Sequence, residues 1–288
     1  MKKLFPLFVC LLLFSCAEKK KVKNDLTRNN YKGSVKSVCD RTYMAYDTTK
    51  VEKGKLMNID SDKYNPAGYE ILYNNYLNGK QLNHQGIYKY DSHNNIIEED
   101  RFDLNLYDTS QPLNVPVTKI YKYTYKFNDE GNITRKIVTI NDVFDERVEY
   151  TLDDDGQEIE NKEYHSGDSL FAQTKNIYGP DGSCIEKDIY RLGGKVTDKS
   201  VIFYDDKGNE QQILRYKGDS LESKVSFQYD DKGNNTDDLS YGFIPGEQLP
   251  SVRHRVYNSF DSKGNWLSMT FYARGNILWI EERTIEYY

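Results

Sequence analysis

The chain has few of the residues on which most catalytic and metal sites depend. Its 288 residues include four cysteines and four histidines, and none stands at the close spacing typical of a zinc site. The sequence signatures of phosphate loops, serine hydrolases and zinc proteases do not occur. We therefore predict no catalytic residue, no metal ligand and no cofactor, and we interpret the chain as a non-enzymatic protein.

Long apolar runs and helical periodicity are also scarce. After the N-terminus, no segment approaches the roughly 18 consecutive apolar residues that a membrane-spanning helix needs. No long stretch places apolar residues at the i, i+3, i+4 and i+7 positions of a helix. The formal net charge is −6, so the chain lacks the basic excess that nucleic-acid phosphates require. Nucleic acid is therefore excluded as a partner.

The N-terminus has the pattern of an export signal. Two lysines precede an apolar run from residue 4 to residue 14, which is too short to span a bilayer. The run ends in Leu13-Phe14-Ser15-Cys16, which resembles the lipobox of bacterial lipoproteins. This resemblance implies cleavage before Cys16 and acylation of that cysteine. An ordinary secretory signal with a chance cysteine is the alternative.

The resemblance divides the chain into a signal peptide (1–15), a lipidated cysteine with a lysine-rich tether (16–30) and a single β-repeat domain (31–288). It implies the membrane as a partner through the lipid anchor, and a place in the bacterial cell envelope as an outer-membrane lipoprotein. The periplasmic side is favoured, because the lysines after Cys16 differ from the acidic signal associated with surface export in Bacteroidota. These lysines are Lys19, Lys20, Lys21 and Lys23.

One short pattern recurs eight times between residues 64 and 265, at intervals of 25 to 37 residues. A copy usually has an aromatic residue, an acidic or amide residue, two spacers, a glycine and an asparagine. The acidic side chain can accept a hydrogen bond from the backbone two residues on, and the glycine supplies a left-handed conformation, so each copy predicts a hairpin turn. The best copies provide the predicted turn residues Asp205, Gly208, Asn209, Asp230, Gly233, Asn234, Asp261, Gly264 and Asn265.

Strands flank each of these turns. Between Leu221 and Tyr229, apolar and polar residues alternate at period two, as in a half-buried strand. We predict an all-β fold: a repetitive antiparallel β-meander of about eight two-stranded repeats that forms an extended curved sheet of roughly eighteen strands. A folded-over two-sheet sandwich is the alternative. A membrane β-barrel is rejected, because the strand from Glu281 to Glu286 carries charge on both faces.

The turns at residues 205, 230 and 261 resemble the YD repeats of the Rhs family, over about residues 60–288. Repeat-bearing envelope lipoproteins of Bacteroidota are the closer resemblance, and MORN-type repeats are the runner-up. The resemblance implies antiparallel hairpins. It does not imply the hollow shell of the large family members, because eight units are too few to enclose another domain.

The predicted function is the non-catalytic binding of an envelope protein or glycan through an extended β-surface. Tyrosines, of which the chain has 25, would either form the core or stay exposed as platforms for the partner. An envelope polysaccharide hydrolase and an accessory subunit of an envelope assembly remain alternatives. The run Asp153-Asp154-Asp155-Gly156 is interpreted as a hairpin turn rather than a calcium loop. No disulfide is predicted between the distant Cys39 and Cys184.

Overall fold

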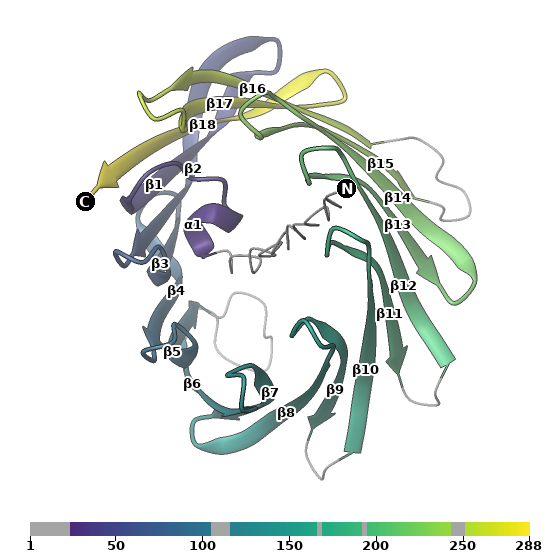
Figure 1. Cartoon of the computed structure of the whole chain (residues 1–288). Coiled ribbons are helices and arrows are strands. Elements are labelled where there is room, and N and C mark those ends of the chain that lie inside the picture. Colours follow the sequence, from purple (N-terminus) through teal and green to yellow (C-terminus); the bar gives the residue numbers. More distant parts are fainter. Residues whose placement is uncertain (1–23, 105–115, 166–168, 192–194, 243–250) are drawn as a thin grey trace, which may run out of the picture.

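A computed structural model describes residues 24–104, 116–165, 169–191, 195–242 and 251–288. The described chain forms a closed ring of eighteen antiparallel strands with a short helix, α1 (Asp25–Arg28), inside the ring (Figure 1). Each strand pairs with its neighbours in sequence, and β1 pairs with both β2 and β18. No helix of the described residues is long and apolar enough to cross a bilayer.

The strands are 8 to 15 residues long. Their bounds are β1 (Val35–Asp47), β2 (Lys50–Tyr64), β3 (Glu70–Leu77), β4 (Gln81–Tyr90), β5 (Ile96–Leu104), β6 (Pro116–Phe127), β7 (Ile133–Ile140), β8 (Val143–Leu152), β9 (Glu158–His165), β10 (Ser169–Tyr178), β11 (Cys184–Arg191), β12 (Lys195–Tyr204), β13 (Glu210–Lys217), β14 (Ser220–Tyr229), β15 (Asn235–Gly242), β16 (Ser251–Phe260), β17 (Trp266–Ala273) and β18 (Asn276–Tyr287).

Closure of the sheet corrects the prediction from the sequence. The expected open, extended meander of YD-like repeats is wrong, and so is the alternative sandwich, because the first and last strands pair with each other. Val38 lies opposite Ile285 and Met44 opposite Trp279 along this seam. Closing the ring satisfies the backbone donors and acceptors that two free edge strands would expose. The protein is therefore a closed antiparallel β-barrel.

The two ends of the barrel differ. Because the strands alternate in direction, the turns after all even-numbered strands lie at one end, together with both chain termini. We call this end the mouth. The backbone N–H of Tyr288 donates to the carbonyl of Ser34 there, at 3.1 Å. The turns after odd-numbered strands lie at the opposite end.

The predicted turn residues form matching turns around the mouth. In the turn after β12, Asp205 Oδ1 accepts from the backbone N–H groups of Lys207 and Asn209, at 2.9 and 2.8 Å. Gly208 has a φ of +81°, a left-handed conformation that glycine adopts at little cost. The turns at Asp230 and Asp261 repeat these bonds, and Gly233 and Gly264 have φ of +80° and +88°.

Tyrosines that precede these turns tie neighbouring strands together at the mouth. Each hydroxyl donates to the carbonyl of the first residue of the strand before, at 2.5 to 3.0 Å. Where the turn itself follows a phenylalanine, as at Phe127 and Phe260, a tyrosine two or three residues earlier makes the bond. The pairs are Tyr90–Glu70, Tyr125–Ile96, Tyr178–Glu158, Tyr204–Cys184, Tyr229–Glu210 and Tyr257–Asn235.

Candidate functional site

The N-terminal segment, residues 24–32, crosses the mouth of the barrel. On one side, the amide of Asn24 donates to Ala67 O at 2.7 Å and the N–H of Leu26 donates to Gly68 O at 3.2 Å. Asn24 also caps α1 by accepting from the Thr27 N–H at 3.0 Å. Figure 1 shows α1 inside the ring beside β1, β2 and β3. Leu26 packs there in a small buried cluster with Val35, Val38 and Tyr64.

Two of the predicted turn asparagines hold the far side of this segment. Asn234 accepts from the Asn30 amide at 3.2 Å, and Asn265 accepts from the Lys32 N–H at 2.7 Å. Asn209 has no such contact with the segment, and its amide donates to Asp205 of its own turn at 2.9 Å. Sequence reasoning predicted the turns but not this second use of two of them. Cys16, the predicted lipidation site, lies outside the described residues.

A recess of about 690 Å³ lies at the mouth beside Arg28 of α1. This volume is within the range of small-molecule sites. The recess lies where the turns after β10 and β12 meet the ends of β11, β12, β13 and β14. Its lining residues are Arg28, Asp181, Gly182, Ser183, Cys184, Tyr204, Lys207, Gly208, Asn209, Glu210 and Tyr229.

Side chains in the recess are suited to binding rather than to nucleophilic attack. The hydroxyls of Tyr204 and Tyr229 donate to Cys184 O and Glu210 O, at 2.9 and 3.0 Å, which fixes both rings. Burial raises the pKa of the Cys184 thiol, against the opposing effect of Lys187, so this cysteine stays protonated at neutral pH. Burial likewise raises the pKa of both tyrosines. The recess therefore offers aromatic rings and fixed polar groups.

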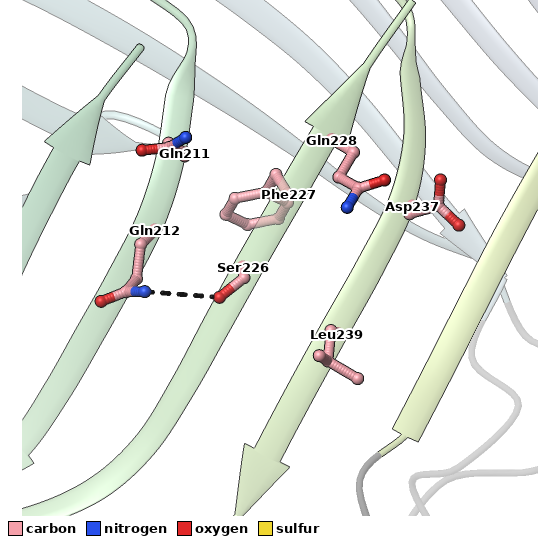
Figure 2. A pocket seen from close by; sticks show the side chains of 7 residues that line it. All are labelled: Gln211, Gln212, Ser226, Phe227, Gln228, Asp237 and Leu239. Atoms are coloured by element: carbon pink, nitrogen blue, oxygen red, sulfur yellow. Dashed lines mark hydrogen bonds between the residues drawn. The ribbon is translucent and has the colours of Figure 1, made fainter.

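Two other hollows lie on the wall and are smaller. Figure 2 shows the first, of about 300 Å³, where side chains from β13, β14 and β15 lie beside one another. Its one marked hydrogen bond joins Gln212 Nε2 to Ser226 Oγ at 3.5 Å. The second, of about 330 Å³, lies between Lys126 of β6, Arg135 of β7 and Lys162 of β9. Neither includes a residue of the N-terminal segment, and neither contains a predicted site residue.

An acidic group on the inner wall packs around one arginine. Arg283 donates to both carboxylate oxygens of Asp40, at 2.7 and 2.5 Å, and its guanidinium lies over the Trp266 ring at 3.4 Å. Burial, with Asp40 and Asp60 nearby, raises the pKa of Asp62 to about 7. Burial and Asp40 raise the pKa of Glu281 to about 7 as well. We regard this group as structural, because it supports the N-terminal segment through Tyr31.

Glu146, Glu163 and His165 face one another, with ligand-type atoms within 4.8 Å. These residues have no metal-ligand spacing in the sequence, because the two glutamates lie on neighbouring strands, β8 and β9. Each carboxylate has a partner within the protein: Lys136 Nζ is 3.0 Å from Glu146, and His165 Nε2 is 2.8 Å from Glu163. The acidic run at Asp153 forms a turn of the mouth, since Asp153 accepts from the N–H groups of Asp155 and Gln157.

No family model and no curated protein matches the chain. Among solved structures, a porin-like protein from Bacteroides uniformis ATCC 8492 aligns over 88% of this chain and 99% of its own, at 10% identity and a TM-score of 0.46. TcdB2-TccC3 aligns over 83% of this chain and 15% of its own, at 12% identity and a TM-score of 0.32. At such low scores these likenesses carry no argument, and the description of the fold depends on the strand pairing alone.

Proposed function

We propose that this protein is a non-catalytic binding barrel of the bacterial cell envelope, which takes a glycan partner at its mouth. The observation that carries the proposal is the recess of about 690 Å³ beside Arg28, with the fixed rings of Tyr204 and Tyr229 in its lining. Aromatic rings present flat apolar faces, and the surrounding side chains and turn backbones offer donors and acceptors for hydroxyl groups.

Attachment to the envelope rests on Cys16. Cys16 lies eight positions before Asn24, where the described chain begins in the mouth. An extended chain of that length reaches about 28 Å. A lipid on Cys16 would hold the mouth, and hence the recess, close to the bilayer surface. Substitution of Cys16 by serine should move the protein from the membrane to the soluble fraction.

Ion pairs on the outer wall support a barrel surrounded by water. Lys89 pairs with Glu98, Arg135 with Glu149 at 2.8 Å and Lys199 with Glu186 at 2.7 Å. These side chains lie on the face opposite to the tyrosines of the mouth, because alternate residues of a strand point to opposite faces. A basic residue that faces lipid at the midplane costs about 2–4 kcal/mol. We therefore propose that the lipid anchor, and not the wall, contacts the membrane.

Direct binding measurements test the proposal. Purified residues 24–288 would be screened against soluble envelope oligosaccharides, and the tightest ligand titrated by calorimetry. We expect Tyr229→Ala to weaken binding at least tenfold and Tyr229→Phe to retain most of it, because phenylalanine keeps the ring. The matched control is Tyr190→Ala, which removes a ring from the outer face of the same wall. Equal effects of Tyr229→Ala and Tyr190→Ala would contradict a site at the mouth.

The same preparation separates the alternatives. Turnover of the bound glycan would favour an envelope polysaccharide hydrolase over a binding protein. A stable complex recovered from envelope extract, with no affinity for any glycan, would favour an accessory subunit of an envelope assembly.

A further inference from the structure

A row of polar side chains crosses three strands below the recess. In the strand register, Lys187 of β11 lies opposite Ser200 of β12, and Ser200 lies opposite Arg215 of β13. The two basic residues therefore flank one serine at matching height. Two strand spacings separate their backbones by about 10 Å. Both side chains are long enough to reach a single group above Ser200.

This row faces the inside of the barrel. Ser200 precedes Tyr204 by four residues on β12. The register shift between Phe203 and Tyr204 skips Gln211 of β13 and no residue of β12, so the side chains of Ser200 and Tyr204 point to the same face. Tyr204 lines the recess at the mouth. The four residues place the row about 13 Å below the mouth. The charge of Lys187 also acts on the Cys184 thiol, which belongs to the recess lining.

Lys187 and Arg215 lack acidic partners. Both are exposed, and neither has an ion pair or hydrogen bond to another residue of the described chain. By contrast, Arg283 on the acidic part of the inner wall is only 9% exposed and binds Asp40 through two bonds. Free basic side chains that share a wall, inside a ring whose other wall is acidic, direct an anion to β11 and β13.

We propose that the glycan bound at the mouth is an acidic oligosaccharide, whose carboxylate or phosphate group binds between Lys187 and Arg215. A guanidinium can bind such a group through two hydrogen bonds, and the lysine adds a second charge. The sugar rings extend from this group toward Tyr204 and Tyr229 at the mouth. A compact anion cannot span the 13 Å or so between the row and the rings. This inference rests on the proposed glycan-binding function and names its ligand class.

Substitution of Glu210 tests whether the ligand is anionic. It lies at the mouth, where it lines the recess and is exposed. Its charge opposes an anionic ligand. Glu210→Gln should therefore tighten the binding of an acidic oligosaccharide severalfold and leave a neutral one unchanged. Asp181 is a weaker choice for this test, because its carboxylate accepts from Ser183 within its own turn.

The experiment compares three ligand sets on residues 24–288 at low and moderate salt: oligogalacturonates, phosphorylated oligosaccharides and neutral oligosaccharides of equal length. We expect the double variant Lys187→Gln, Arg215→Gln to lose at least tenfold in affinity for one acidic set, and wild-type affinity for that set to fall with salt. The matched control is Lys126→Gln, Lys224→Gln, which removes two basic residues from the outer face. Arg215→Lys should retain part of the affinity, and unchanged thermal unfolding would show that the variants fold.

The outcomes are distinct. Preference for uronates or for phosphates identifies which acidic group the row binds, and either supports the inference. Equal affinity for acidic and neutral sets, or an unaffected Lys187→Gln, Arg215→Gln variant, overturns the inference and leaves a neutral glycan site at the mouth. Failure of every oligosaccharide to bind overturns the proposed function itself.

Discussion

Two parts of the inner wall use charge in different ways. On β1, β2 and β18, acidic groups are packed around Arg283, and the N-terminal segment covers them with Tyr31 and Leu26. On β11 and β13, Lys187 and Arg215 have no acidic partner in the described chain. We call β1, β2 and β18 the packed wall, because its charged groups bind one another and stabilise the barrel. We call β11 and β13 the open wall, because its basic groups remain available to bind a ligand.

The largest effect is expected at Arg283. Arg283→Ala leaves Asp40 without its partner, and the two side chains are only 9% and 13% exposed. Removal of one member of a buried pair costs about 3–5 kcal/mol of unfolding free energy. Urea unfolding followed by far-ultraviolet circular dichroism measures it. Arg215→Ala is the control from the open wall and should change stability by less than about 0.5 kcal/mol. Similar losses for both variants would remove the distinction between the walls.

Leu26→Ala should have the next largest effect. Its side chain is 7% exposed and packs against Val35, Val38 and Tyr64, so truncation leaves a cavity and costs about 2–3 kcal/mol. We also expect hydrogen exchange to rise at residues 24–32, because their main apolar contact is lost. Val256→Ala, at an outer position 37% exposed, is the control. Unchanged exchange at residues 24–32 would show that hydrogen bonds alone hold the segment.

Substitutions at two turn glycines distinguish the cost of backbone strain in a turn from the release of the N-terminal segment. Gly264→Val and Gly208→Val both place a β-branched residue at positive φ, with no neighbouring atom within 4 Å of the new Cβ, so each costs about 1–3 kcal/mol. Only the first adjoins the N-terminal segment, through Asn265 and Lys32. Proteolysis near Arg28 should therefore speed up in Gly264→Val alone. Equal cleavage in both variants would point to general loosening of the barrel.

The free energy of unfolding should fall as pH rises, because two buried carboxyl groups of the packed wall lose their protons. The folded pKa values of Asp62 and Glu281, about 7, lie above the unfolded values near 4. Such groups contribute stability below about pH 4, and this contribution is lost as pH rises toward 7. After discount for solvent screening, we expect a change on the order of 1 kcal/mol. Unfolding midpoints from pH 4 to 8 measure it, and Asp62→Asn should flatten the curve. A wild-type curve that rises over this range would contradict the assignment.

Local features of the chain could be predicted from the sequence, whereas closure could not. The alternation up to Tyr229 and the turn chemistry at Asp230 and Gly233 act within a few residues, and the structure has a strand and a turn there. Pairing of β1 with β18 joins residues more than 240 positions apart, such as Val38 and Ile285. No local pattern records such a pairing. The charges on both faces of β18 indicate whether the strand can contact lipid. They do not indicate whether the sheet closes into a barrel.

The candidate site also depends on distant contacts. Tyr204, Glu210 and Tyr229 stand out in the sequence only as members of a repeat, and nothing marks them as neighbours of Arg28. Arg28 reaches the recess because the N-terminal segment, predicted in part as a tether, enters the mouth and binds Asn234 and Asn265. Lys187, Ser200 and Arg215 lie 13 and 15 positions apart in the sequence, at no spacing that marks them as a group. Only the strand register reveals that they form one row.

The seam between β1 and β18 has a consequence for biogenesis. Among the described strands, β18 is the last in chain order and pairs with β1, the first, and the hydroxyl of Tyr288 donates to Tyr64 O at 2.5 Å. The ring therefore cannot close until β18 is available to pair with β1. Until then, β1 and the growing end of the sheet each present an unpaired edge that can join another chain. Removal of β18 should therefore cause aggregation rather than closure of a smaller barrel.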